Sequence, residues 1–151
     1  MTDFSDKIVQ ILNHGALNLA LSLGYSLKIF DVMDKIGEPA TLETLAAATT
    51  LDRRYLKEWL GIMVTGEIIT LSAGPLQKKD PEKAVQEETY YLPPAHADVL
   101  TRRAGNNNLG VYTREMPLLT TCAMEAVQTG FLTGQGVSFD HYPRFQGFMS
   151  E

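Results

Sequence analysis

The order of helix starts and turns in the middle of the chain most constrains how it can fold. Thr41 precedes a short Ala-rich run at residues 42–48, and Asp52 precedes a longer amphipathic run from residue 53 to about 64. Threonine and aspartate side chains cap helices by accepting hydrogen bonds from the free N–H groups of the first turn. The pattern therefore predicts a short helix, a tight turn at residues 49–51 and a longer helix.

Two strands are expected after this helix pair. Residues 67–71 and 89–92 are rich in β-branched and aromatic side chains, and a polar, charged stretch at residues 72–88 separates them. A short helix, a tight turn, a longer helix and two strands follow one another in the order of a winged helix-turn-helix. The sequence therefore predicts this fold, with a two-stranded wing of unusual length.

The helix predicted at residues 4–23 carries more apolar surface than one buried face requires. Its main stripe is formed by residues three or four positions apart, namely Ile8, Leu12, Ala16, Leu19 and Leu23. Between residues 16 and 23, apolar side chains surround most of the helix, which must therefore be covered on several sides. Either a second chain covers it, or it is the central helix of a single chain. We take Leu12, Ala16, Leu19 and Leu23 as candidate dimer-interface residues.

Further helices flank the winged helix. Gly24 is expected to end the first helix, and residues 25–36 are expected to form a second. After the wing, residues 94–101 resemble a short helix and residues 102–108 a loop. A helical pattern resumes near Leu109. Pro117 either breaks or kinks this helix or starts a fresh helix at its first position, and Gly130 is a candidate end.

The predicted fold class is thus mainly α. The winged helix-turn-helix is flanked by N-terminal dimerisation helices and C-terminal linker helices. We predict a helical dimerisation and winged-helix domain over residues 1–104, and linker helices over residues 105–151.

Composition narrows the classes of partner and location. The net charge of −5 disfavours nucleic acid and anionic membranes, because both attract basic surfaces. Cys122 is the single cysteine, so an internal disulfide is excluded and a reducing, cytoplasmic location is expected. The acidic N-terminus does not resemble a secretory signal, and no apolar run approaches the length of a membrane span.

No catalytic or metal-binding motif is evident. The chain has no P-loop, HExxH, CxxC or GxSxG pattern, and Gly134-Gln135-Gly136 is interpreted as a turn. The three histidines lie far apart without a ligand partner at helical spacing, so no metal site is expected. We assign no catalytic residue.

A winged helix can bind DNA or serve as a protein-interaction scaffold. Arg53, Arg54 and Lys57 lie at the start of the helix that would enter the major groove. Asp52 and Glu58 offset two of these charges, and the wing segment carries a net charge of −1. A wing that lies along phosphates should not be acidic. We therefore favour an interaction and lid module over a winged-helix transcription regulator.

The chain resembles a known family along nearly its whole length. The most specific run is Tyr-x-x-Glu-Trp-Leu-x-x-Met-Val within residues 54–66, and further likeness lies in Gly24-Tyr25 through Phe30-Asp31-Val32-Met33, Thr41-x-x-Thr44-Leu45-Ala46, Tyr91-Leu92-Pro93-Pro94-x-His96 and Tyr142-Pro143-Arg144-Phe145. These runs resemble the N-terminal winged-helix dimerisation domain of S-adenosylmethionine-dependent methyltransferases. They are similar to small-molecule O-methyltransferases, and in particular to mycobacterial winged-helix methyltransferases.

The resemblance implies a module that is not catalytic by itself. Family members continue into a Rossmann-like domain, whose glycine-rich loop holds S-adenosylmethionine, and we expect that domain to be missing from this chain. The cofactor is therefore expected in the full-length family and not here. The expected partner is a second copy of the chain or a full-length relative, with neither nucleic acid nor a membrane.

The resemblance also implies residues near a substrate pocket. Tyr142, Arg144 and Phe145 match the segment that precedes the catalytic domain, and by this resemblance they could lie near the pocket. Alternatively, Tyr142 and Phe145 only pack the linker helix. The helix that usually backs the substrate cavity would contribute Tyr112, Met116 and Leu119. Asn13 and Asn18 either face a substrate, are solvated or join two helices by a hydrogen bond.

Overall fold

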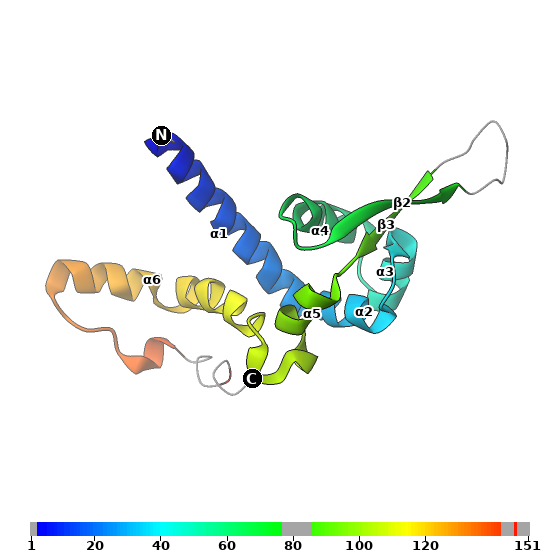
Figure 1. The fold of residues 1–151 in the computed structure, drawn as a ribbon. Coiled ribbons are helices and arrows are strands. Elements are labelled where there is room, and N and C mark those ends of the chain that lie inside the picture. The colour runs from blue at the N-terminus through cyan, green and yellow to red at the C-terminus, as the bar shows by residue number, and fades with distance from the viewer. Residues whose placement is uncertain (1–2, 77–85, 143–146, 148–151) are drawn as a thin grey trace.

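Helices dominate the computed structural model, which describes residues 3–76, 86–142 and 147 (Figure 1). The mainly α winged-helix fold is confirmed. The elements in chain order are α1 (Phe4–Ser26), α2 (Ile29–Ile36), β1 (Ala40–Thr41), α3 (Leu42–Thr49), α4 (Arg53–Thr65), β2 (Thr70–Leu76), β3 (Gln86–Tyr91), α5 (Pro94–Leu100), the 3-10 helices η1 (Arg102–Asn107) and η2 (Val111–Arg114), α6 (Glu115–Thr133) and the 3-10 helix η3 (Phe139–His141).

The two predicted caps start the helix-turn-helix. Thr41 Oγ1 accepts a hydrogen bond from the backbone N–H of Thr44 at 3.2 Å, at the start of α3. Asp52 Oδ1 accepts hydrogen bonds from the N–H groups of Arg54 at 3.0 Å and Tyr55 at 3.2 Å, at the start of α4. These contacts satisfy N–H groups that would otherwise lack a partner in the first turn of each helix.

The sheet has three antiparallel strands in the order β1-β3-β2. The wing strands β2 and β3 pair as predicted, with Thr70 opposite Tyr91 and Ser72 opposite Thr89. Strand β1, whose Ala40 lies opposite Tyr90, was not predicted. A strand of two residues, the second of which is the helix cap Thr41, offers too little pattern to predict.

The predicted strand at residues 67–71 was wrong at its start. Glu67 adopts a left-handed conformation with φ of 59°, and the N–H of Ile68 donates to the carbonyl of Met63 at 2.8 Å. His96 Nδ1 lies 2.8 Å from the carbonyl oxygen of Ile68. These contacts keep residues 67–69 in the turn after α4, so that β2 begins at Thr70.

The core lies where α1, α2, α4 and the sheet meet. Trp59, predicted to be a core residue, donates a hydrogen bond from Nε1 to the carbonyl oxygen of Ala20 at 2.8 Å. Its ring centroid lies 5.3 Å from that of Phe30. Other buried members of this core include Tyr25, Ile29, Met33, Leu45, Leu56, Leu60, Met63, Ile69, Tyr90, Leu92 and Leu100.

Gly24 does not end α1, contrary to the prediction. A Cβ atom at this position would lie 2.4 Å from Cζ2 of Trp59, so the glycine allows α1 to approach the core closely. The helix continues to Ser26, and Lys28 then adopts a left-handed conformation with φ of 58°. The second helix therefore begins at Ile29, four residues later than predicted.

Two predictions for the C-terminal region were wrong, and one of the two alternatives for Pro117 is close to the structure. Residues 102–107 form 3-10 turns interrupted by a kink at Gly105, where a loop was predicted. Pro117 lies in the first turn of α6, where its missing N–H leaves no hydrogen bond unmade. Gly130 lies inside α6, and the helix ends instead at Gly134, whose φ is 73° and whose N–H donates to the carbonyl of Gly130 at 2.8 Å.

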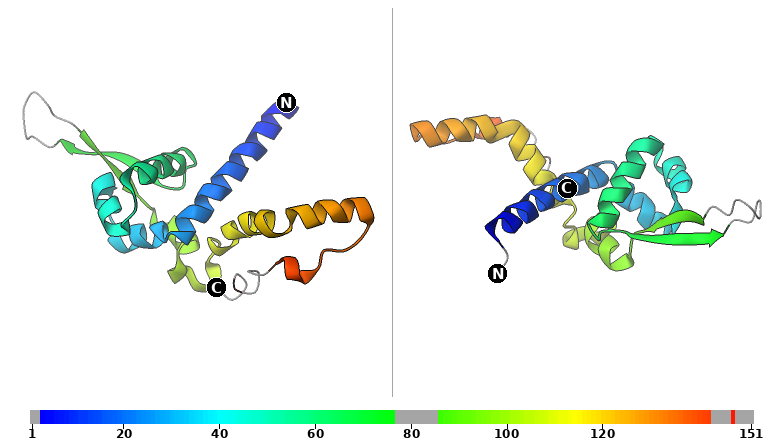
Figure 2. Two further views of the ribbon diagram at one scale, coloured as in Figure 1. Left: turned by 180° about the vertical axis from the view of Figure 1, so that it is seen from behind. Right: turned by 90° about the horizontal axis from the view of Figure 1, so that it is seen from above.

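The first half of α1 and most of α6 extend away from the winged helix toward the same side (Figures 1 and 2). Among the described residues, no single helix is long and apolar enough to cross a membrane. The pair α1 and α2, bent by 67° relative to each other, passes that test only when the two helices are joined.

Candidate functional site

An uncovered apolar stripe on α1 is the most prominent surface feature of the described chain. Every residue from Asp3 to Ala16 is exposed. Beyond this segment α1 contacts the core through one side, where Ala20 and Tyr25 are buried. Of the candidate interface residues, Leu12 is 66% exposed, Leu19 53% and Leu23 51%, and Ala16 is exposed as well. This chain therefore leaves the stripe of α1 uncovered, and it buries α1 residues only along the second half of the helix.

A groove of about 620 Å³ lies between α1 and α6. Its walls are mostly apolar or neutral, and they are formed by His14, Gly15, Asn18 and Leu19 on α1 and by Met116, Pro117, Thr120 and Thr121 on α6. The groove brings a candidate interface residue, Leu19, next to a candidate substrate-lining residue, Met116. Tyr112 is exposed on η2 and Leu119 is half-buried on α6, and neither lines this groove.

Asn18 links α1 to η2, the 3-10 helix that precedes α6. Its Nδ2 donates a hydrogen bond to the carbonyl oxygen of Thr113, at 3.3 Å, in the turn that leads into α6. Of the alternatives for Asn18, the structure thus shows the contact between helices. Asn13 is exposed and lines a second groove of about 520 Å³ between α1 and the end of α4. His14 lines both grooves.

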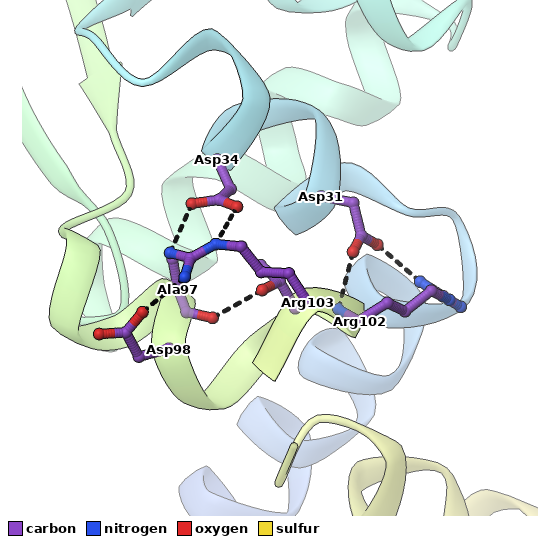
Figure 3. A network of polar contacts seen from close by, with 7 residues as sticks. Asp31, Asp34, Ala97, Asp98, Arg102 and Arg103 are labelled. Atoms are coloured by element: carbon purple, nitrogen blue, oxygen red, sulfur yellow. Dashed lines mark hydrogen bonds and ion pairs between the residues drawn. The ribbon is translucent and has the colours of Figure 1, made fainter. Parts of the chain in front are cut away.

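Two arginines attach the segment after α5 to the winged helix (Figure 3). Arg102 donates to Asp31 of α2 twice, from Nη1 at 2.6 Å and from its backbone N–H at 2.9 Å. Arg103 donates to both carboxylate oxygens of Asp34, at 2.5 and 2.8 Å, and to Asp98 at 2.7 Å. The hydrogen bonds to Asp34, and to a smaller extent the one to Asp98, raise the pKa of the Arg103 guanidinium.

Tyr25, at the end of α1, extends this attachment. The Arg102 guanidinium carbon lies 4.2 Å from the centroid of the Tyr25 ring, and Asn108 Nδ2 donates to Tyr25 Oη at 2.9 Å. Gly110 packs against one edge of the ring, where a Cβ atom would lie 2.6 Å from Cδ2 of Tyr25. These contacts fix the start of η2 and α6, and hence the α6 wall of the groove. We call Tyr25, Asp31, Asp34, Asp98, Arg102, Arg103, Asn108 and Gly110 the junction cluster.

The contacts of the junction cluster were not predicted from the sequence. Asp31 and Arg102 are 71 positions apart, and Asp34 and Arg103 are 69 apart. Periodicity and capping signals report only neighbours in the sequence, so they hold no information on these pairs.

The face that would meet DNA carries carboxylates among its basic residues. Arg53 Nε pairs with Glu43 Oε1. A groove between α4 and the sheet is lined by both of these residues together with Lys57, Glu87 and Glu88. This arrangement offsets much of the positive charge at the start of α4.

The candidate pocket residues near the C-terminus are only partly described. The Tyr142 ring lies 6.3 Å from that of Phe139, at an interplanar angle of 52°. Arg144 and Phe145 lie outside the described residues. Across residues 3–76 and 86–142, no group of three or more His, Cys, Asp or Glu side chains could hold a metal ion.

Comparison with known families agrees with this fold. Residues 15–102 match the Rv2258c-like winged HTH domain. This chain belongs to that family. The matched region of the Rv2258c-like domain runs from the middle of α1 through the wing to Arg102 of the junction cluster. It thus includes the second half of the α1 stripe.

A solved structure shares the fold over most of the chain. Human N-acetylserotonin methyltransferase, solved in complex with S-adenosylmethionine, matches with a TM-score of 0.65 and 13% sequence identity over 89% of this chain. The match lies in the N-terminal region of that enzyme, and the chain spans 36% of its length. At this identity the likeness establishes the fold alone. Among curated proteins, no significant match was found.

Proposed function

We propose that this Rv2258c-like domain is the N-terminal dimerisation and substrate-lid module of a methyltransferase-like protein that uses S-adenosylmethionine. The observation that carries the proposal is the exposed apolar stripe of α1 beside the groove it shares with α6. The shared fold with the N-terminal region of human N-acetylserotonin methyltransferase supports it. Exposed apolar surface of this extent in a winged-helix domain is typical of an interface.

The lid role follows from the chemistry of the groove. Its volume of about 620 Å³ is in the range of small-molecule pockets. Leu19, Met116 and Pro117 offer apolar contact, while Asn18 and the two threonines of α6 can orient a polar group. We infer that Met116 contacts the methyl acceptor, whereas Tyr112 and Leu119 lie outside this groove.

The methyl donor belongs to another domain in this proposal. The module closes over that domain and excludes water, so that donor and acceptor are held in a reactive orientation. Tyr142, Arg144 and Phe145 would lie on the path toward the donor domain. We further propose a cytoplasmic location for the assembled protein.

We propose that the partner is a second copy or a full-length relative, rather than DNA. The ion pair between Arg53 and Glu43, and the glutamates beside Lys57, favour this choice. Duplex DNA at about 50 mM salt provides the test, since non-specific phosphate contacts are strongest at low salt. We expect no mobility shift, and binding that weakens with added salt would instead support a transcription regulator.

Sedimentation equilibrium tests the dimerisation role. We expect the chain to form a dimer, and Leu19→Asp to shift it to monomer because a charge would be buried in the interface. The control is Tyr55→Asp, which places the same charge on α4 at a side chain that is 77% exposed. The control variant should sediment with the same dimer mass as the wild-type chain. A wild-type chain that stays monomeric at high concentration would refute dimerisation.

The test of the lid role uses the natural protein, which is captured with an antibody to α1. Its intact mass is measured by mass spectrometry. We expect a mass well above 16.7 kDa, and methyl transfer from S-adenosylmethionine by that protein. There Met116→Arg should raise KM for the acceptor with little change in KM for the donor. If the natural mass were near 16.7 kDa, methyl transfer would be assayed in mixtures with a full-length relative. If Met116→Arg changed the KM for the acceptor and the KM for the donor equally, the lid role would be contradicted.

A further inference from the structure

The large side chains of the exposed apolar stripe of α1 are spaced symmetrically about one point in the middle of the helix. Six large apolar side chains, five on α1 and Leu27 directly after it, fall into three pairs whose residue numbers add up to 31: Phe4 with Leu27, Ile8 with Leu23, and Leu12 with Leu19. All six are exposed in the described chain. Val9 and Ile11 are also exposed on α1 and lie outside these pairs. The midpoint of the series lies between Gly15 and Ala16.

We propose that α1 pairs antiparallel with α1 of a second copy, about a two-fold axis beside Gly15 and Ala16. This inference rests on the proposed dimer and specifies its register. In a two-fold interface the same patch on both copies must be complementary to itself. An antiparallel pair places position n opposite position 31 − n, so each of the six paired side chains meets another member of the stripe.

The centre of the stripe allows the two helices to approach closely. Gly15 has no heavy atom within 4 Å of where its Cβ would lie, so nothing in this chain fills the space in front of it. Ala16 is exposed beside it. Helix axes pack 8–10 Å apart depending on the side chains at the contact, and small residues favour the lower value. The bulky pairs then lie on both sides of this contact, at Leu12 and Leu19.

The charges at the ends of the stripe are arranged in the same way. Asp3 precedes α1 and Lys28 follows it, and their numbers also add up to 31. Both side chains are exposed. Antiparallel pairing brings Asp3 of one copy toward Lys28 of the other at each end of the interface. Parallel pairing would instead bring each of these charges toward its own counterpart, which is unfavourable.

The shape of the chain gives this register a consequence for the groove. The first half of α1 is free, and the second half lies against the winged helix (Figure 1). Antiparallel pairing places the free half of one copy along the anchored half of the other. Leu12 of the second copy then meets Leu19, which lines the groove between α1 and α6. Each copy therefore completes the groove of the other.

Disulfide cross-linking tests the register in a Cys122→Ser background, which removes the single native thiol. Ala16→Cys lies beside the proposed axis, so two copies of this variant should cross-link on mild oxidation. Ile8→Cys is the matched control on the same stripe. Antiparallel pairing places two copies of residue 8 about 15 positions apart along the helix, roughly 22 Å. A disulfide requires Cα atoms within about 7 Å, so this control should not cross-link.

A mixture of Leu12→Cys and Leu19→Cys variants should yield the mixed disulfide in preference to either self-linked product. Cross-linking of both Ala16→Cys and Ile8→Cys would show a parallel pair and overturn the register. A dimer in sedimentation without cross-linking at residue 16 would place the interface elsewhere, which overturns this inference and leaves the proposed dimer intact. A monomer in sedimentation would refute both.

Discussion

Substituting Gly24 by alanine tests how tightly α1 packs on the core. The new Cβ atom would lie 2.4 Å from Cζ2 of Trp59 and 2.8 Å from Cε2 of Phe30. Ordinary van der Waals contact begins at 3.4 Å, so the Trp59 ring would have to move by roughly 1 Å. Both rings belong to the packed core, and the indole also holds the Ala20 carbonyl at 2.8 Å. The substitution therefore strains packing and a buried hydrogen bond together.

Two opposing terms set the size of the effect. Alanine stabilises a helix interior relative to glycine by about 0.5–1 kcal/mol. Overpacking a core costs about 1–3 kcal/mol, and a weakened buried hydrogen bond adds about 0.5–1.5 kcal/mol. We therefore expect Gly24→Ala to destabilise the chain by about 1–3 kcal/mol. In a chain of this size each kcal/mol lowers the melting temperature by roughly 2–4 °C.

Urea unfolding followed by the fluorescence of Trp59, the single tryptophan, provides the assay. The matched control is Gly61→Ala in α4, where the added Cβ meets no atom within 4 Å. The control should be stabilised by about 0.5–1 kcal/mol, because only helix propensity changes there. If Gly24→Ala were stabilised as much as the control, the close contact between α1 and Trp59 would be refuted.

Three further substitutions test the caps and the junction cluster. Gly110→Ala should lower the melting temperature by several degrees in circular dichroism, because its Cβ would lie 2.8 Å from the rigid carbonyl of Leu100; an unchanged melting temperature would contradict the close packing against Tyr25. Asp52→Ala should cost about 0.5–2 kcal/mol in urea unfolding, since two N–H groups of α4 lose their acceptor, while Asp52→Asn should retain most of the stability. Asp31→Asn should lower the free energy of unfolding by only about 1 kcal/mol, because the ion pair with Arg102 is partly exposed. If this loss of stability were as large at high salt as at low salt, the contact would not be a charge interaction.

The helix-turn-helix could be predicted from sequence because its signals are local. Thr41 and Asp52 mark the helix starts through hydrogen bonds to the next three residues, and both caps are present. Trp59 lies on the apolar face of α4, where the periodicity predicted it. Each of these features depends on residues within one or two helical turns, which is the range over which sequence patterns carry information.

The predictions for glycine were less accurate, because glycine has more than one structural use. Gly24 and Gly130 were interpreted as helix ends, yet both lie inside helices. Gly24 is required for close approach to Trp59, which lies 35 positions away in the sequence. Only the tertiary contact distinguishes such a glycine from one that ends a helix with a positive φ, as Gly134 does.

The candidate site was predictable in part. The exposed stripe of α1 follows directly from a pattern that is apolar on too many sides. The groove was not predictable, because it requires Leu19 and Met116 to lie close in space although they are far apart in the chain. The junction cluster sets that proximity, and its ion pairs leave no signature in the order of residues.

The exposed first half of α1 ties the folding of this segment to protein concentration. Residues 4–16 contact little of their own chain, so these helical turns are held mainly by their own backbone hydrogen bonds. Helical segments of about 12–15 residues are marginally stable in water without packing. On dilution these turns would unwind, and a partner would rewind them at a cost in conformational entropy. Mean residue ellipticity would then rise with concentration, and the amount of protein present would itself determine how much of the helix exists.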